Sequence, residues 1–467
     1  MTTPRFDPGS FRDREARVFY RGDRVFRALS QTAADAWERL SASDFYGRLV
    51  EEGRIVSTRR ADIGDADFEE LSGRWVAVLE HERIPFISYP YEWCFGMLQD
   101  AGLLQLDLLL AALDEGMILK DSSAYNFQWQ GPRPVLIDIA SFEEWPQGDP
   151  WAGYLQFCQL FLYPLMLTAY RGIAFQPWLR GSLDGISPDD CNRLFSWRDR
   201  LRRGVLTDVF LQAKLQARNA DSNAPVRREL QRAGFNKQLI VNNVKRLRKI
   251  VSRLQWRPAS SEWASYADEN SYDRENREIK ERFVAEAVGL RKWGLVWDLG
   301  CNTGTFSRIA AGNADYVVAF DADQLAVERL YRSLRADGPT NILPLFNNLA
   351  DSSPALGWRH RERSALTERS TPDLTLCLAL IHHMVITANI PLPDFVEWLA
   401  SLGSALVIEF VTKDDPMVQK LLRNKVDIYD DYEVEVFESC LNESFDVQRQ
   451  ETLQQGTRRL YFAVPAS

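Results

Sequence analysis

The chain has 467 residues, of which 45% are hydrophobic and 26% charged, as expected of a water-soluble globular protein with roughly two or three domains. Its 56 basic and 65 acidic side chains give a net charge of −9, which excludes a general electrostatic attraction to nucleic acid or anionic lipid. The six cysteines lie far apart without a CxxC pair, which argues against a zinc site and against a disulfide framework.

The N-terminal segment and the most apolar stretch both bear on where the protein resides. Residues 1–19 are polar and charged, unlike a secretory signal. Residues 154–170 are very apolar but shorter than a membrane span, and they contain a proline. We therefore expect a buried helix at 154–170, no membrane span and a cytoplasmic protein.

The first half of the chain predicts a mixture of strands and helices. Residues 15–29 predict two short strands around a turn at Arg21-Gly22-Asp23, and residues 33–52 predict a helix. Residues 75–93 predict a buried strand that continues into a proline-rich connector. Apolar residues at helical spacing predict a helix over 98–115. Residues 150–220 are expected to be mostly helical, with breaks at Pro164, Pro177 and Pro188.

A basic amphipathic helix is predicted over residues 236–255. The stretch 226–257 holds ten Lys or Arg and one acid, Glu229. We interpret this charge as a solvated helix face, and the alternative is a contact for an anionic substrate. The turn-rich segment 257–261 is the expected boundary between an N-terminal domain, 1–256, and a C-terminal domain, 257–467.

The second half predicts regular alternation of strands and helices. Short apolar runs separated by helical segments indicate a largely parallel sheet covered on both faces, an α/β fold of the Rossmann-like class. The predicted strands are 295–300, 316–321, 341–346, 374–380, 405–411 and 459–464.

A glycine-rich turn follows the first of these strands. The residues Asp298, Gly300, Asn302 and Gly304 lie where the strand ends and a helix begins, and a glycine there lets a cofactor approach the backbone. The spacing differs from the dinucleotide fingerprint G-x-G-x-x-G. It resembles the D-x-G-x-x-x-G form of class I methyltransferases that use S-adenosylmethionine, in which these residues line the cofactor. Asn302 stands where many members have glycine, and asparagine tolerates a left-handed backbone.

Polar residues after the next two strands complete the expected cofactor site. Asp321 ends the second strand, and its carboxylate can accept both ribose hydroxyls. By the same resemblance, Asp323 is a second candidate for the ribose, and Asn348 and Leu349 are the expected adenine contacts. The alternative is a nucleotide site for another cofactor, such as a nicotinamide.

The chemical step requires an aligned acceptor and, for a hydroxyl, removal of a proton. His382 and His383 follow the fourth strand, so one of them is a candidate general base or anion ligand, with shaping of the loop as the alternative. Glu409 is a further catalytic candidate; the alternatives are that it pairs with Lys413 or is solvated. Tyr272 precedes the first strand, where related enzymes close over the cofactor.

A second constellation lies in the first half. Asp121, Asn126 and Asp138 are spaced like the catalytic loop and metal-binding aspartate of kinases and aminoglycoside phosphotransferases. The resemblance implies Asp121 as the base, with Asn126 and Asp138 holding Mg²⁺ beside ATP. No glycine-rich phosphate loop accompanies them, and Arg27 is the nearest candidate cation. The alternatives are a kinase-like domain that only binds or scaffolds, and a chance arrangement.

As a whole, the chain resembles the NoeA-type nodulation proteins and related bacterial methyltransferases. We expect methyl transfer from S-adenosylmethionine to a hydroxyl or phosphate oxygen of a small molecule or glycan; nucleic acid is not expected as a partner. The alternatives are a bifunctional kinase-methyltransferase and a non-catalytic cofactor-binding regulatory protein. The resemblance lies in EHERIPFISYPYEW (80–93), LKDSSAYN (119–126), DLGCNTGTFS (298–307), LALIHHM (378–384) and EFVTKDDPM (409–417).

Overall fold

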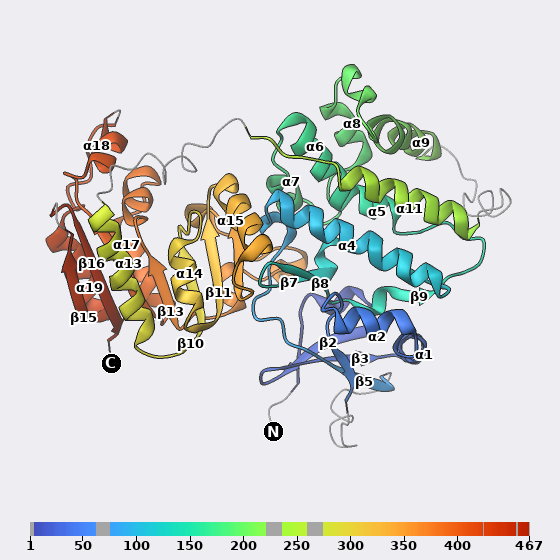
Figure 1. Ribbon diagram of the computed structural model, residues 1–467, viewed down its shortest axis with the longest axis horizontal. Coiled ribbons are helices and arrows are strands. Elements are labelled where there is room, and N and C mark those ends of the chain that lie inside the picture. The colour runs from blue at the N-terminus through green and yellow to red at the C-terminus, as the bar shows by residue number, and fades with distance from the viewer. Residues whose placement is uncertain are drawn as a thin grey trace. The chain divides into compact units, whose positions relative to one another are not determined.

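The computed structural model describes residues 4–61, 75–220, 236–258, 274–423, 425–453 and 456–466 (Figure 1). These residues form two compact units. Unit 1 comprises residues 1–129, 134–258 and 356–363, and unit 2 comprises residues 130–133, 259–355 and 364–467.

Unit 1 begins with a five-stranded antiparallel sheet of order β1-β2-β3-β5-β4. The predicted hairpin is confirmed, because β2 and β3 pair from Ala16↔Leu29 to Arg21↔Arg24 around a two-residue turn. The helix predicted over 33–52 is wrong as one element, since it is two helices separated at Ala42-Ser43. The bounds are β1 (Arg5–Phe6), β2 (Ala16–Arg21), β3 (Arg24–Leu29), α1 (Gln31–Ser41), α2 (Asp44–Glu51), β4 (Thr58–Arg60) and β5 (Ala77–His81).

Helices and short hairpins follow this sheet. The prolines at 177 and 188 stand in the first turns of helices, where the missing N–H is not needed. The elements are α4 (Phe95–Asp114), β6 (Met117–Leu119), β7 (Phe127–Gln130), β8 (Arg133–Leu136), β9 (Phe142–Glu144), α5 (Tyr154–Phe157), α6 (Tyr163–Arg171), α7 (Gln176–Gly181), α8 (Pro188–Leu194), α9 (Leu211–Ala220) and α11 (Lys237–Val251).

The apolar stretch at 154–170 is a buried helix, as predicted. The predicted break at Pro164 is wrong, because a π-helical turn, Cys158–Leu162, joins α5 to α6 and accommodates the proline without ending the helix. One other described helix, α4, has the length and composition of a membrane span, and 67% of its most apolar window is buried in the structure. That burial is typical of a core helix.

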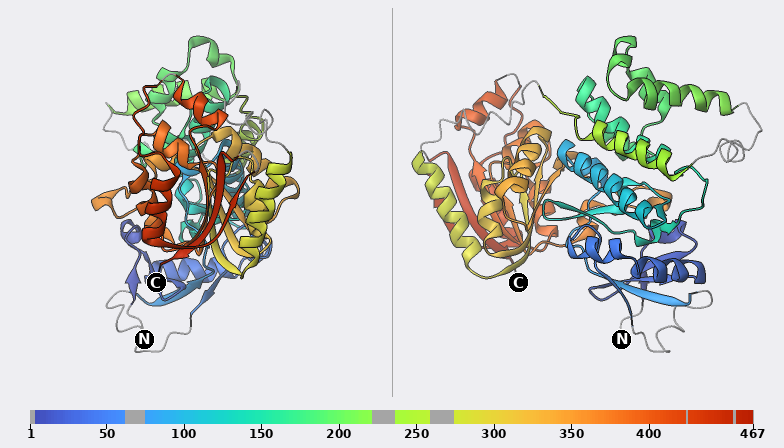
Figure 2. Two further views of the ribbon diagram at one scale, coloured as in Figure 1. Left: turned by 90° about the vertical axis from the view of Figure 1, so that its left-hand side faces the viewer. Right: turned by 45° about the vertical axis from the view of Figure 1, so that its right-hand side comes forward.

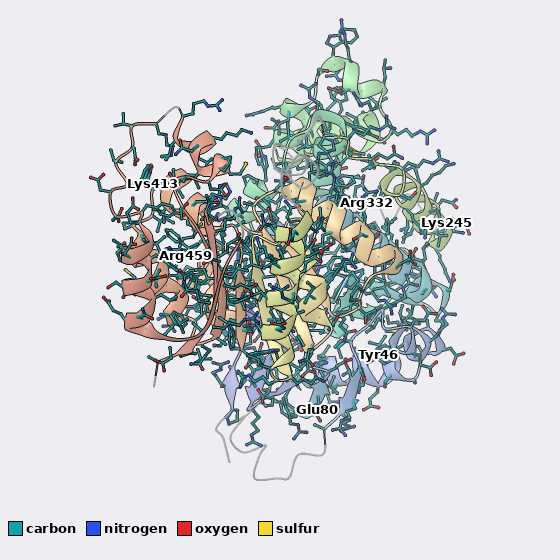
Figure 3. All side chains as sticks on the ribbon, turned by 60° about the vertical axis from the view of Figure 1, so that its left-hand side comes forward. Tyr46, Glu80, Lys245, Arg332, Lys413 and Arg459 are labelled. Atoms are coloured by element: carbon teal, nitrogen blue, oxygen red, sulfur yellow. The ribbon has the colours of Figure 1, made fainter. Side chains whose placement is uncertain are left out.

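The basic helix α11 lies with its apolar face inward. Ile240, Val244, Leu247 and Val251 are buried, as the periodicity predicted. Lys245 points outward and is exposed (Figure 3). Arg246 pairs with the buried Asp208 and Arg248 pairs with Asp107, so the interpretation as a solvated face holds only in part.

Unit 2 is built on a seven-stranded sheet of order β12-β11-β10-β13-β14-β16-β15. The first five strands in this order are parallel, β16 is antiparallel to β14, and β15 is antiparallel to β16. The six predicted strands are confirmed, although β13 ends three residues early, at Cys377. The strand β15 was not among those predicted. The bounds are β10 (Trp293–Leu299), β11 (Ala314–Asp321), β12 (Ile342–Phe346), β13 (Leu374–Cys377), β14 (Ala405–Val411), β15 (Phe445–Thr452) and β16 (Arg458–Pro465).

Helices cover both faces of this sheet. Figure 2 (left) shows α13 and α19 on opposite sides of it, and α13 packs beside α14 while α17 packs beside α19. The strand order reverses between β10 and β13, and ligands of doubly wound sheets bind outside the carboxyl ends at such a point. The helices are α13 (Arg274–Gly289), α14 (Thr305–Ala311), α15 (Gln324–Asp337), α16 (Leu366–Arg369), α17 (Leu392–Ser401), α18 (Pro416–Leu422) and α19 (Val434–Ser444).

Candidate functional site

The glycine-rich turn joins β10 to α14 at the carboxyl edge of the sheet. Gly300, Asn302 and Gly304 have φ angles of 77°, 49° and 83°, all in the left-handed region. A Cβ on Gly304 would lie 2.5 Å from Leu330 Cδ1, so Leu330 would have to move, and the φ of 83° disfavours any residue with a side chain there. The backbone N–H groups of Gly300 and Cys301 both donate to Phe320 O at 2.9 Å, which fixes the turn against β11.

Asp298 lies beneath this turn. Its side chain is buried, and Ser307 Oγ donates to Asp298 Oδ2 at 2.5 Å. Burial raises the pKa of Asp298 to about 6 despite that hydrogen bond. The carboxyl group of Asp298 thus links the first turn of α14 to the end of β10, and this link holds the glycine-rich turn between them in place.

Asp321 stands at the end of β11, beside the turn. Its Oδ2 accepts from the backbone N–H of Asn302 at 2.7 Å, and its Oδ1 accepts from that of Asp323 at 2.8 Å. Burial raises the pKa of Asp321 to about 6. Each oxygen retains a second lone pair, so the carboxylate can still accept hydroxyl groups. Asp323 is buried and caps α15 through the N–H of Leu325, at 2.8 Å.

The three residues that follow Phe346 of β12 differ in how deeply they are buried. Asn347 is buried next to Asp321, since its N–H donates to Asp321 O at 2.9 Å. Its side-chain Oδ1 is buried without a hydrogen-bond partner among the described residues. Asn348 is exposed and caps the N–H of Ala350 at 3.1 Å, and Leu349 is half-buried. The sequence favoured Asn348 and Leu349, whereas the unsatisfied acceptor is on Asn347, the first residue after the strand.

The two histidines follow β13 at the carboxyl edge of the sheet, the same edge as the glycine-rich turn. His382 is fully buried and His383 half-buried, with their ring centroids 4.2 Å apart. Burial, then the neighbouring His383, Arg458 and Lys280, holds the pKa of His382 well below its usual range. Burial and Arg458 lower the pKa of His383 to about 4. Both imidazoles are therefore neutral near pH 7.

A strained residue precedes the histidines. Ala379 has a φ of 50°, which costs a residue with a Cβ about 1–2 kcal/mol. We expect Ala379→Gly to raise the free energy of unfolding by about 0.5–1 kcal/mol, measured by urea denaturation, because glycine adopts this φ freely. The matched control is Ala400→Gly in α17, which should lower it by about 1 kcal/mol. Destabilisation by both variants would show that Ala379 is not strained.

Glu409 on β14 has partners that the sequence did not suggest. It is fully buried, is paired with Lys280 of α13, and accepts from Arg458 Nη1 at 3.3 Å. Burial raises its pKa, but the two cations outweigh burial and lower the pKa below its ordinary value. The suggested partner Lys413 instead pairs with Asp427 at 3.3 Å, so the suggested pairing with Lys413 and the solvated alternative are both wrong.

Arg458 extends the Glu409 network to a second acid. Its Nε and Nη2 donate to Asp415 at 2.6 and 3.1 Å. Lys280, Glu409, Arg458 and Asp415 are thus a buried, charge-balanced chain that joins α13, β14 and β16. The spacing of these residues, far apart in sequence, gave no signal of this arrangement. Tyr272, expected near the cofactor, lies outside the described residues.

Asp138 and Asn126 of unit 1, which the sequence compared with kinases, are held by residues of neighbouring elements. Arg27 on β3 is buried, and its Nη1 donates to Asp138 Oδ1 at 2.6 Å. The N–H of Ile137 donates to Asn126 O at 2.9 Å, which holds Asn126 beside the strand that leads to Asp138. Burial and then the charge of Asp138 raise the pKa of Asp121, and hydrogen bonds from Asn126 and Ser123 oppose that rise. Among the described residues, no three His, Cys, Asp or Glu side chains gather as a metal site.

Solved structures similar to this chain include methyltransferases. The N-methyltransferase NodS of Bradyrhizobium japonicum WM9 with S-adenosyl-L-homocysteine is 15% identical, covers 44% of this chain and 94% of its own, and has a TM-score of 0.30. Magnesium protoporphyrin IX methyltransferase of Synechocystis PCC 6803 is 19% identical, covers 42% of this chain and 88% of its own, and has a TM-score of 0.29. These scores are too low to support an inference, so the fold assignment rests on the strand order.

One protein of known sequence is similar to this chain over nearly its full length. No family model matches the chain. The nodulation protein NoeA of Rhizobium meliloti (strain 1021) is 36% identical over 468 residues, which cover 97% of this chain and 94% of that protein. Identity of this extent spans both units. The chain belongs to the NoeA family of nodulation proteins.

Proposed function

We propose that unit 2 is an S-adenosylmethionine-dependent methyltransferase that acts on a hydroxyl or phosphate oxygen of a small molecule or glycan. One observation carries the proposal: the turn at Gly300–Gly304, the carboxylate of Asp321 and the unsatisfied oxygen of Asn347 meet at the carboxyl ends of β10, β11 and β12. A left-handed glycine turn, a ribose acceptor and an adenine acceptor in that order fit this cofactor.

The residues present fit the three parts of the cofactor. The turn at Gly300–Gly304 would lie against its amino-acid part, where side chains would obstruct it. Asp321 would accept the two ribose hydroxyls, and Asn347 Oδ1 would accept the adenine amino group, which would satisfy a buried acceptor. When bound, the cofactor supplies a methyl group already activated by the sulfonium.

The acceptor would be oriented by His383. Its neutral ring can accept a hydrogen bond from a hydroxyl and hold the oxygen in line with the methyl group. His382 lies against it and limits its movement. Glu409 is paired and fully buried, so it supports the site through Lys280 and Arg458.

The pH dependence of cofactor binding follows from Asp321. Its carboxylate accepts hydroxyls when ionised, and its pKa is raised to about 6. Affinity should therefore be constant above about pH 7 and fall as the pH drops through 6, approaching tenfold per pH unit, because binding must then displace a proton. Calorimetry at several pH values measures this. Affinity that is flat between pH 7 and 5 would contradict the assignment.

Replacement of both histidines separates binding from turnover. The variant His382→Asn/His383→Asn should bind the cofactor as the parent does but turn over at least tenfold more slowly. Because the pKa of His383 is lowered to about 4, the parent's turnover should not fall between pH 8 and 6 through protonation of this ring. If the double variant turns over as fast as the parent, neither histidine takes part in the chemical step.

The reaction is tested with the full chain and cofactor carrying a labelled methyl group. Fractionated glycans and phosphorylated small molecules are supplied as acceptors, and product is identified by mass spectrometry. A labelled ether or phosphate ester supports the proposal. A nitrogen-methylated product would overturn the choice of oxygen and leave the methyltransferase standing. Labelled product formed equally well by Asp321→Ala would contradict the site.

A second candidate function is suggested by the cluster of Asp121, Asn126, Asp138 and Arg27. Mg²⁺ binds with one or two carboxylates and several waters, so two neighbouring aspartates would suffice for ATP and Mg²⁺. Arg27, paired with Asp138, supplies the nearby cation. The bifunctional alternative predicts that ATP with Mg²⁺ raises the melting temperature of the parent but not that of Asp138→Asn. An equal response of both would leave unit 1 as a binding or scaffold domain.

A further inference from the structure

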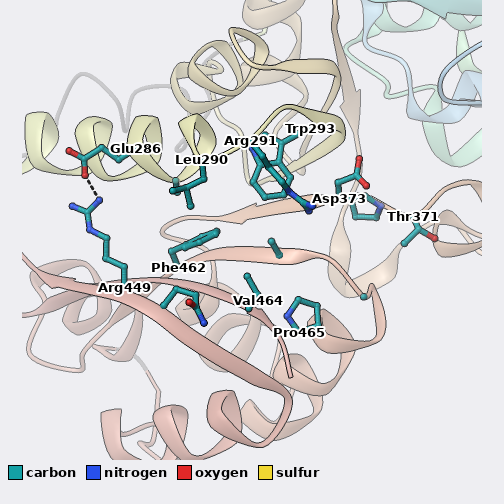
Figure 4. Close-up of a pocket in the computed structure, with 15 residues that line it drawn as sticks. Glu286, Leu290, Arg291, Trp293, Thr371, Asp373, Arg449, Phe462, Val464 and Pro465 are labelled. Atoms are coloured by element: carbon teal, nitrogen blue, oxygen red, sulfur yellow. Dashed lines mark hydrogen bonds and ion pairs between the residues drawn. The ribbon is translucent and has the colours of Figure 1, made fainter. Parts of the chain in front are cut away.

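A pocket of about 850 Å³ opens at the amino ends of the parallel strands of unit 2, the edge opposite the glycine turn (Figure 4). The last turn of α13 borders it on one side and the hairpin of β15 and β16 on the other. Small-molecule sites usually measure about 300–1,000 Å³. This pocket is thus large enough for a ligand and separate from the proposed cofactor site.

The lining is largely apolar. Phe462 and Val464 of β16 face Leu290, which ends the helical segment above them (Figure 4). Leu290 is 65% exposed, so much of its apolar surface is available to a ligand in the pocket. Trp293 contributes the wall at the start of β10 and is itself buried. An apolar body placed here would remove Leu290 from water.

One cation in the lining has no neutralising acid. The guanidinium of Arg291 lies 4.2 Å from the ring centroid of Trp293 and forms no ion pair with a described residue. The other charged groups are engaged: Arg449 pairs with Glu286 and with Glu451, and Asp373 accepts the N–H groups of Gly294 and Leu295 at 2.9 Å. Asp373 keeps its negative charge, so the two acids and two arginines of the lining sum to zero, and Arg291 is the one cation among them that no acid of the described residues pairs with.

A β-bulge places a further polar group there. Val447 pairs with Ala463 and Arg449 with Phe462, so Gln448 is the extra residue in β15. Bulges re-aim side chains and are frequent beside binding sites. Gln448 lines the pocket as a neutral donor.

We propose that this pocket binds a small amphipathic carboxylate. Its apolar body would lie on Phe462, Val464 and Leu290, and its carboxylate would meet Arg291, held in place by Trp293. This site is independent of the proposed methyl transfer, since it lies at the other edge of the sheet.

Octanoate is the probe, titrated into the full chain by calorimetry with octanol and octylamine as tail-matched controls. We expect saturable binding of octanoate, at least tenfold weaker binding of both controls, and at least tenfold weaker octanoate binding by Arg291→Gln. The matched variant Lys292→Gln removes the adjacent cation, which pairs with Asp315 and does not line the pocket, and should bind as the parent does. Val464→Trp fills the pocket and should abolish binding.

Four outcomes would overturn the proposal. Equal affinity in Arg291→Gln and Lys292→Gln would place the ligand elsewhere, and equal affinity for octanol would remove the role of the charge. Absence of saturable octanoate binding would show that the pocket is not a carboxylate site. A concentration-dependent dimer that Arg291→Gln abolishes would show that this surface is an interface between two copies of the chain. Binding that persists in Asp321→Ala keeps this test separate from that of the cofactor site.

Discussion

Asp321→Ala is expected to weaken binding of S-adenosylmethionine by at least 100-fold. The substitution removes a carboxylate that would make two charge-assisted hydrogen bonds to the ribose, at about 1.5–3 kcal/mol each. It also removes the acceptor for the N–H groups of Asn302 and Asp323, which hold the turn in place. Titration calorimetry measures the loss.

The matched control is Asp315→Asn. Asp315 lies on the same strand, but its side chain is 64% exposed and pairs with Lys292. Asp315→Asn should leave the affinity for S-adenosylmethionine unchanged. The free energy of unfolding in urea should be similar for the parent, Asp315→Asn and Asp321→Ala. If Asp321→Ala binds the cofactor as tightly as the parent, the ribose is held elsewhere and the site assignment fails.

The second large effect is on stability. Glu409→Ala should lower the free energy of unfolding of unit 2 by about 3–5 kcal/mol, because Lys280 is left charged in a buried position and Arg458 keeps only Asp415. Urea-induced unfolding, followed by hydrogen exchange in peptides from β14, measures the change.

A double variant keeps this prediction testable if Glu409→Ala does not fold. Lys280→Met/Glu409→Leu replaces the ion pair by apolar side chains of similar volume, and such replacements are commonly neutral or stabilising. It should recover most of the stability, while Arg458 retains Asp415. If Glu409→Ala lowers the free energy of unfolding by less than about 1 kcal/mol, the buried network does not stabilise unit 2 as we infer. The same holds if the double variant is no more stable than Glu409→Ala.

The sheet of unit 2 was largely predictable because its core strands are short apolar runs. β15 was missed because it is an edge strand whose residues alternate, with only Phe445 buried and polar side chains facing solvent. β13 ends early because Ala379 takes a left-handed conformation that no propensity would assign to alanine. In unit 1, the break at Ala42-Ser43 was missed because both flanking helices share one continuous amphipathic pattern.

The candidate site was predictable where it depends on local motifs. Gly300, Gly304 and Asp321 follow strands at recognisable spacing, so the sequence places them at one edge. The choice between Asn347 and Asn348 depends on which side chain turns inward, and two adjacent asparagines carry no local signal for this. The partners of Glu409 come from α13 and β16, more than a hundred and nearly fifty residues away, so only the fold brings them together.

The most direct measurement is calorimetric titration of the full chain with S-adenosylmethionine, with S-adenosylhomocysteine and NADH titrated in parallel. The proposed cofactor site predicts one saturable site for each of the first two ligands and no binding of NADH. Binding of NADH without S-adenosylmethionine would make the glycine turn a nicotinamide site, and the methyltransferase proposal would be wrong.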